Sequence, residues 1–160
     1  MTLNYTSGPL SLAATTHQYK VDGSTTSNEI STTEFQAYSA RYAVSSSLAV
    51  NALYAKNKTT GLNGTQSGKN DVTQVGAAYT MGKTVLVAQY GEGEGEGTAG
   101  ASRRDRKGYQ LGAIYNLSKR TNVYGIYGSQ EAKYVDAASS GTAGTKEKAS
   151  GYAVGLRHSF

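Results

Sequence analysis

Apolar and polar residues alternate along much of this chain, which is the pattern of β-strands with one apolar face. Between Gln74 and Lys83, one set of alternate positions holds Val, Ala, Tyr and Met, and the other holds polar or small residues. A similar segment begins at Gln110, 36 residues further along, a weaker copy begins at Ala37, and a last partial copy begins at Val154. A repeat of this length with alternation inside it indicates a series of β-hairpins.

The pattern predicts nine strands, and all but the first have about the 9–11 residues that a tilted strand needs to cross a membrane. The expected ranges are 1–7, 10–20, 34–44, 48–57, 72–81, 84–92, 107–117, 121–132 and 150–160. Short polar turns alternate with long polar loops at 21–33, 58–71, 93–106 and 133–149. This layout is typical of an outer-membrane barrel with periplasmic short turns. We therefore predict an all-β fold of antiparallel up-and-down transmembrane β-barrel strands, in a single region covering residues 1–160.

Tyrosines recur at both ends of the predicted hairpins. Tyr has an apolar ring and a polar tip, and such residues concentrate where hydrocarbon meets water. The alternative is a soluble β-sandwich, in which Tyr follows its strand propensity. The chain has 2 Phe, no Trp and 38% apolar residues, which is little for a soluble core. The predicted membrane-interface girdles consist of Tyr42, Tyr79 and Tyr115 at one end and Tyr54, Tyr90 and Tyr127 at the other.

Composition removes several other classes of protein. No stretch approaches the roughly 20 apolar residues of a membrane helix. The absence of Cys excludes disulfides and thiolate metal sites. The first residues lack the basic and apolar parts of a secretory signal, so we expect a mature form or a fragment of a longer protein. The formal charge of +5 is not gathered on one face with stacking aromatics, so we expect no nucleic-acid partner.

The segments 117–121 (LSKRT) and 154–160 (VGLRHSF) resemble Gram-negative porins of the betaproteobacterial type, and the resemblance runs over most of the chain. It implies that 117–121 is the last periplasmic turn and that the final strand carries a signal for the barrel assembly machinery. It also implies a 16-stranded outer-membrane barrel, usually a homotrimer, about twice as long as this chain and surrounded by lipid and lipopolysaccharide. The implied assembly signal consists of Tyr152, Val154, Leu156 and Phe160.

Nine is an odd number of strands, and an up-and-down barrel closes in antiparallel fashion only with an even number. The resemblance therefore implies that the chain supplies the C-terminal half of a porin. The alternative is a complete eight-stranded barrel made of residues 10–160, with a structural or surface-binding role through its long loops. The interior of such a small barrel would be filled with side chains.

Alternation also predicts a polar set of residues that faces the pore. Arg41 and Arg157 occupy the same place in the repeat, and fixed positive charge in a pore wall attracts anions. The alternative is that these arginines pair with acidic groups of a constriction loop, which the resemblance places in the N-terminal half. The predicted pore-lining residues are Arg41, Arg157, Asn51, Gln74, Gln89, Gln110, Asn116 and Asn122.

Two charged segments have weaker interpretations. The basic run 103–107 is expected at the extracellular end of a strand, where it either reaches lipopolysaccharide phosphates or remains a solvated loop. Glu92, Glu94 and Glu96 could bind Ca²⁺ or Mg²⁺. Because they alternate with Gly, however, we expect a flexible loop and no metal site.

No enzymatic constellation emerges from the sequence. His17 and His158 are the two imidazoles, and neither has the spacing of a Ser-His-Asp triad. We predict an outer-membrane porin that forms a water-filled channel for passive diffusion of small hydrophilic solutes, with anion preference, without cofactors and without enzymatic activity.

Overall fold

The computed structural model describes residues 1–21, 31–61, 66–97, 102–136 and 145–160. It contains nine antiparallel strands in chain order, which confirms the predicted number and the all-β fold class. No helix in these ranges is long and apolar enough to cross a membrane. The strands are β1 (Thr2–Ser7), β2 (Leu10–Val21), β3 (Ser31–Ala43), β4 (Leu48–Thr60), β5 (Gln66–Met81), β6 (Thr84–Glu96), β7 (Ser102–Asn116), β8 (Thr121–Asp136) and β9 (Lys146–His158).

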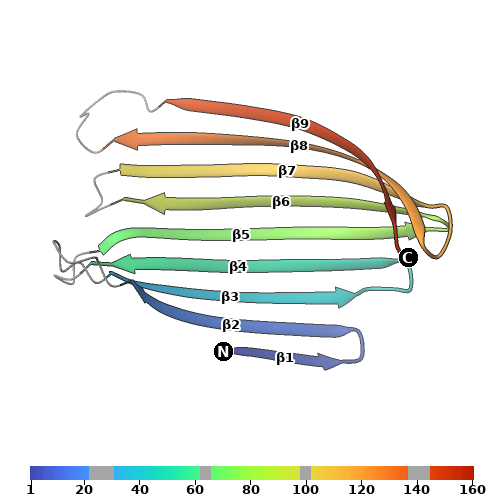
Figure 1. Cartoon of the computed structure of the whole chain (residues 1–160), viewed down its shortest axis with the longest axis horizontal. Coiled ribbons are helices and arrows are strands. Elements are labelled where there is room, and N and C mark those ends of the chain that lie inside the picture. The colour runs from blue at the N-terminus through green and yellow to red at the C-terminus, as the bar shows by residue number, and fades with distance from the viewer. Residues whose placement is uncertain (22–30, 62–65, 98–101, 137–144) are drawn as a thin grey trace.

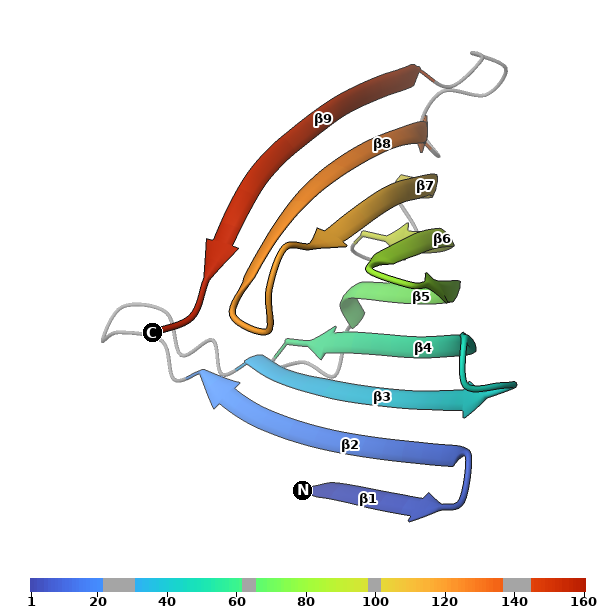
Figure 2. The ribbon, with the colours of Figure 1, turned by 90° about the vertical axis from the view of Figure 1, so that its right-hand side faces the viewer.

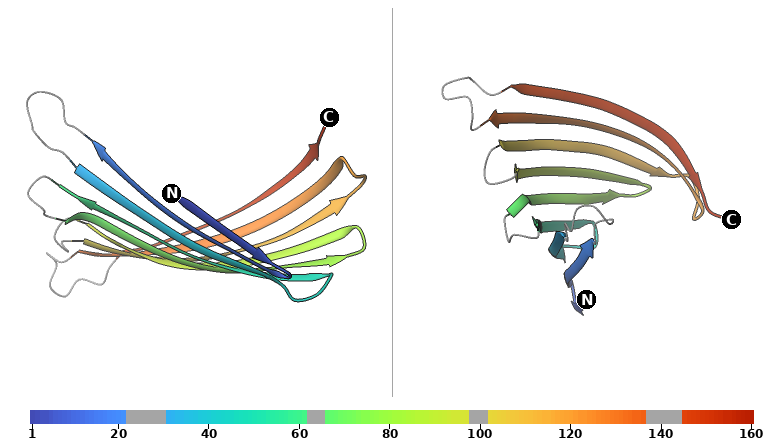
Figure 3. Two further views of the ribbon diagram at one scale, coloured as in Figure 1. Left: turned by 90° about the horizontal axis from the view of Figure 1, so that it is seen from below. Right: turned by 60° about the vertical axis from the view of Figure 1, so that its left-hand side comes forward.

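The strands form one sheet in which each strand pairs with its neighbours in the chain (Figure 1). Figures 2 and 3 show that this sheet is a single layer bent into a trough. Within the described ranges, β1 pairs only with β2 and β9 only with β8, so the sheet is open. A closed eight-stranded barrel requires β2 to pair with β9. Because β2 lies between β1 and β3, that alternative is not the arrangement found.

Tight turns join the strands at one end of the sheet, which we call the turn end; the opposite end is the loop end. Gly8 (φ 53°) and Gly82 (φ 59°) adopt the left-handed backbone conformation that two-residue hairpin turns require. In the two longer turns, the hydroxyls of Ser45 and Ser118 each accept two backbone N–H groups further along the turn, at 3.0 to 3.2 Å. Local chemistry therefore sets each turn and, through it, the register of the hairpin.

The sheet has almost no buried core. In the described part of the chain only Thr33 and Ala132 are buried, and no side chain is fully buried. A soluble β-sandwich needs a second sheet packed on the first, and the structure has one layer. In the described strands many large apolar side chains, such as Val75 and Leu111, are exposed, as expected for a face that meets an apolar medium.

Most strands extend further toward the loop end than predicted. The loop expected at 93–106 was wrong in extent, because β6 continues to Glu96 and β7 begins at Ser102. The loops expected at 58–71 and 133–149 were likewise too long, and β9 ends at His158, two residues before the predicted end. The cause is that both faces are polar here, so apolar alternation disappears while pairing continues. The centres of the four predicted loops, at 22–30, 62–65, 98–101 and 137–144, lie outside the described residues.

Candidate functional site

Cross-strand register sorts the side chains into two faces, because directly opposite residues of an antiparallel pair point to the same side of the sheet. One side, the outer face, carries a band of Val, Leu and Ala between the turn end and the middle of the strands. Leu111 lies opposite Ala88 and Tyr127, and Val75 lies opposite Ala52 and Tyr90. The band contains Ala40, Val50, Ala52, Val75, Ala77, Leu86, Ala88, Leu111, Ala113, Val123, Val154 and Leu156.

Tyrosines border this apolar band on the outer face at both ends. At the loop-end border, Tyr90 lies opposite Tyr109, and Tyr127 lies opposite Tyr152. The rings of Tyr109 and Tyr127 are 6.1 Å apart. The six predicted girdle residues all lie on this face, but the girdle prediction missed three tyrosines. These are Tyr38, Tyr109 and Tyr152, the last of which was predicted only as part of the assembly signal. The complete borders are Tyr38, Tyr54, Tyr90, Tyr109, Tyr127 and Tyr152 on the loop side and Tyr42, Tyr79 and Tyr115 on the turn side.

The opposite side, the inner face, is polar and more crowded. Along β4 the residues of this face, such as Asn51 and Asn57, are half-buried, whereas the alternate residues Ala52, Tyr54 and Lys56 are exposed. Side chains converge on the concave side of a bent sheet, so the inner face is the concave one. The register places all eight predicted lining residues there: Arg41, Asn51, Gln74, Gln89, Gln110, Asn116, Asn122 and Arg157.

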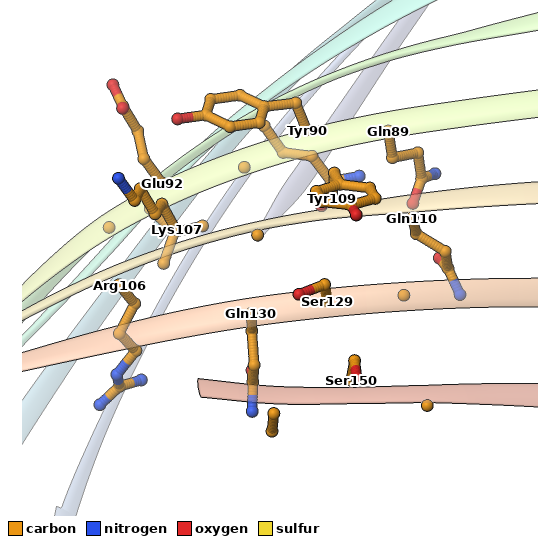
Figure 4. Close-up of a pocket in the computed structure, with 18 of the residues that line it drawn as sticks. Gln89, Tyr90, Glu92, Arg106, Lys107, Tyr109, Gln110, Ser129, Gln130 and Ser150 are labelled. Atoms are coloured by element: carbon orange, nitrogen blue, oxygen red, sulfur yellow. The ribbon is translucent and has the colours of Figure 1, made fainter. Parts of the chain in front are cut away.

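Several of these polar residues surround a hollow of about 680 Å³ that spans β5 to β9 on the inner face. Gln74, Gln89 and Gln110 line it together with Arg106 and Gln130, which the sequence prediction did not include. Figure 4 shows Arg106, Gln110 and Gln130 extending to one side of the sheet and Tyr90 and Glu92 to the other. The hollow therefore has amide and guanidinium groups available for hydrogen bonds to water or a polar solute.

Glycines on the inner face make room for the larger polar and aromatic side chains of neighbouring strands. A Cβ added at Gly76 would lie 2.7 Å from the side-chain oxygen of Asn51. One added at Gly155 would lie 2.5 Å from the ring of Tyr124. Tyr124 is thus an inner-face residue packed over a glycine, unlike the tyrosines of the outer face. This close approach explains two of the many strand glycines.

The loop end of the inner face carries additional positive charge. Arg104 and Arg106 belong to this face, because Arg104 lies opposite Gly95 and Tyr134, and Arg106 opposite Gly93 and Ala132. The guanidinium carbon of Arg104 lies 4.6 Å from the centre of the Tyr134 ring, and the Tyr134 hydroxyl donates to Glu147 at 3.1 Å. The sequence contained the signal for these arginines, since counting back in twos from Gln110 reaches both.

The basic run 103–107 is therefore divided between two faces and lies in β7 rather than in a loop. Arg103 is on the outer face, where it forms ion pairs with Glu94 (2.6 Å) and Asp105 (2.8 Å). The acidic segment is also strand, with Glu92 opposite Lys107 and Glu96 opposite Arg103. The expectation of a flexible acidic loop was wrong, because opposite charges across β6 and β7 pair favourably. The described residues contain no cluster of three or more His, Cys, Asp or Glu side chains suited to a metal ion.

The last strand presents the predicted assembly signal on the outer face. Tyr152, Val154 and Leu156 alternate along β9, are 64–85% exposed and lie opposite outer-face residues of β8. Phe160 follows the end of β9, and its ring makes an edge contact with His158 at 4.9 Å. His158 also shares a 2.9 Å hydrogen bond with the Thr121 hydroxyl. The other imidazole, His17, is on the inner face, opposite Phe35.

Comparison with known protein families shows to which family a chain with these two faces belongs. A family model described as Gram-negative porin matches residues 1–135. The chain belongs to the Gram-negative porins. This confirms the resemblance drawn from the sequence, and it places the porin in the bacterial outer membrane. A search of curated protein sequences found no significant match.

Solved structures show the same fold. Outer-membrane expressed OmpT of Vibrio cholerae is 20% identical in sequence, with a TM-score of 0.75 over 98% of this porin chain and 54% of its own. A trimer form of in-vitro folded OmpT of Vibrio cholerae is 22% identical, with a TM-score of 0.73 over 98% and 54% of the two chains. A variant of that protein lacking loop L8 has a TM-score of 0.72 at 18% identity, over 98% of this chain and 51% of its own. The porin chain thus spans about half the length of these structures.

Proposed function

We propose that the nine strands form part of the wall of a water-filled channel through which small hydrophilic solutes and ions diffuse passively. The observation that carries this proposal is the division of the sheet into an apolar outer face and a concave inner face lined by Arg, Asn and Gln. In a membrane the outer face would contact lipid, and the inner face would contact water. The channel would act without cofactors and without turnover, so the porin would not be an enzyme.

Charge on the inner face supports anion preference. Arg41, Arg104, Arg106 and Arg157 all belong to this face, whereas Glu147 is its single carboxylate among the strand side chains that the structure describes. The remaining described strand carboxylates lie on the outer face: Glu34, Asp71, Glu92, Glu94, Glu96, Asp105 and Glu131. Positive charge along a water-filled wall raises the local concentration of anions and repels cations.

In the membrane, the backbone N–H and C=O groups at both edges of the sheet need hydrogen-bond partners, since an unpaired one in hydrocarbon costs several kcal/mol. We propose that further strands complete a barrel of about sixteen strands, the lower end of the range for wide porins. Such a barrel holds an aqueous channel. Because OmpT of Vibrio cholerae has a trimer form, a homotrimer is the proposed assembly of this porin. The Tyr borders would then mark the two edges of the hydrocarbon layer, with lipid between them.

Planar-bilayer recordings test the proposed channel. We expect stepwise conductance increases on insertion of the folded native porin and a reversal potential that shows anion preference in a salt gradient. The variant R41E/R157E should shift the reversal potential toward cations, because it inverts two inner-face charges. The matched control K56E/K58E makes the same charge change on the outer face and should leave the reversal potential unchanged. Folded porin that produces no conductance steps would contradict the channel.

A further inference from the structure

A cluster of lysines lies on the outer face beyond the loop-side tyrosines of β7, β8 and β9. Its members are Lys107, Lys133, Lys146 and Lys148, and we call it the lysine cluster. Glu131 is the carboxylate at its centre, with Lys107 at 3.7 Å and Lys148 at 3.3 Å. Glu131 therefore forms ion pairs with two of the four lysines of the cluster.

The other two lysines face each other. Lys133 lies directly opposite Lys146 in the β8–β9 register, and like charges in this position repel. Neither lysine forms an ion pair with a carboxylate in the described part of the chain. The carboxylate opposite Lys133 on β7, Asp105, already accepts from the Nε of Arg103 at 2.8 Å. The cluster thus has excess positive charge, which an anion from outside the sheet would neutralise.

Lysines on β4 and β5 provide an internal contrast. Lys56 lies opposite Asp71, and Lys69 lies opposite Glu96 and forms a 2.8 Å ion pair with Asp71. Lys58 lies opposite Lys69 on one side and opposite Glu34 on the other. Each lysine of this second group therefore has a carboxylate directly across a strand, whereas Lys146 in the lysine cluster has none. The two groups share the outer face and the loop end, so the difference between them is the supply of counter-charge.

The position of the lysine cluster along the strands, relative to the tyrosine border, indicates what kind of anion can reach it. Lys148 lies four residues beyond Tyr152 on β9, which is about 13 Å along the strand. Tyr side chains in such borders sit at the boundary between hydrocarbon and headgroups, so the cluster lies in the headgroup layer. The long loops of outer-membrane barrels are extracellular, and the lipid at that side is the phosphorylated glycolipid of the outer leaflet.

We propose that the lysine cluster binds the phosphate groups of lipopolysaccharide on the lipid-facing side of the wall. Ammonium groups bind phosphate oxygens through charge-assisted hydrogen bonds, and each basic residue near an anionic lipid surface contributes about 1 kcal/mol. Lys133 and Lys146 supply the charges that form no ion pair with the described residues, and Lys148 and Lys107 flank them. This site is independent of the proposed channel, because it uses the opposite face of the strands.

Binding of bisphosphorylated lipid A to the native porin in detergent, measured by native mass spectrometry in the presence of EDTA, tests the proposal. Chelation removes Mg²⁺ bridges between phosphate and the neighbouring carboxylates. We expect K133Q/K146Q/K148Q to bind on the order of a hundredfold more weakly, which corresponds to three lost lysine contacts. The charge-preserving variant K133R/K146R/K148R should retain binding within about threefold.

The matched control is K56Q/K58Q/K69Q, which removes the same charge from the same face and should weaken binding less than about threefold. Monophosphorylated lipid A should bind more weakly than the bisphosphorylated form, and phosphatidylglycerol and inorganic phosphate more weakly still. Equal losses in the two Lys→Gln variants would overturn the proposal, because binding would then follow net charge alone. Phosphatidylglycerol bound as tightly as lipid A would also overturn it. Unchanged heat-modifiable migration in electrophoresis would verify that each variant is folded.

Discussion

The two faces of β7 differ in the polarity of their side chains and in what those side chains contact. Gln110 and Leu111 are adjacent in sequence, yet Gln110 lines the concave hollow and Leu111 lies in the exposed apolar band. Alternation places them on opposite sides of a sheet only one strand thick. In the proposed channel the same strand would meet two solvents, and each face can be altered with little direct change to the other.

The largest expected effect comes from placing a charge in the apolar band. Arg at the middle of a lipid-facing barrel surface costs about 2–4 kcal/mol, so Leu111→Arg should lower the free energy of unfolding by that amount or prevent assembly. The control Gln110→Arg adds the same side chain on the inner face and should cost less than about 1 kcal/mol, the usual range for polar surface changes. Urea unfolding in phospholipid vesicles measures both. Equal losses would remove the distinction between the faces.

A smaller effect is expected from filling the space over an inner-face glycine. The added methyl of Gly155→Ala would lie 2.5 Å from the Tyr124 ring, and overpacking of this kind costs about 1–3 kcal/mol. Gly151→Ala, on the same strand and face, meets no atom within 4 Å and should be neutral or slightly stabilising. The same unfolding measurement compares them. If Gly151→Ala proved the more harmful variant, the packing of Tyr124 over β9 would be contradicted.

The smallest effect is expected from the exposed ion pairs at the loop end of the outer face. Arg103 bonds to Glu94 and Asp105, but all three side chains are about half exposed. Exposed pairs contribute about 0–1 kcal/mol, so Arg103→Ala should change the free energy of unfolding by less than about 1 kcal/mol. Salt should reduce this difference further. A loss as large as that of Leu111→Arg would mean that Arg103 lies in the hydrocarbon layer rather than beyond it.

Much of this arrangement could be predicted from alternation alone. The assignment of Leu111 and Gln110 to opposite faces needed only a count in twos. The register likewise puts the other residues predicted to line a pore on the inner face and those predicted to form girdles on the outer face. The extension of β6 and β7 was missed because Glu92, Glu94 and Glu96 alternate with glycine, which is also a loop composition. Alternation of apolar and polar residues can reveal a strand only where one of its faces is apolar. The loop-end parts of β6 and β7 lie beyond the apolar band, so they show no such alternation.

Other features were missed because they depend on neighbouring strands. In the sequence nothing distinguishes Tyr124 from the other tyrosines, because its packing over Gly155 depends on the pairing of β8 with β9. Arg103 and Arg104 read as one basic run, although they face opposite sides of the sheet. The lysine cluster joins residues of three strands, so its excess charge appears only with the register of β7, β8 and β9. Local patterns predict the direction of a side chain, whereas cross-strand partners decide its chemistry.

The central claim is that the inner face contacts water and the outer face contacts lipid. The chain contains no Cys, so single substitutions can be labelled without removing a native thiol. In the porin reconstituted into vesicles, Gln110→Cys should react rapidly with a charged, membrane-impermeant thiol reagent, and Leu111→Cys should not react until detergent is added. Rapid labelling of Leu111→Cys in the membrane, with Gln110→Cys protected, would contradict the account.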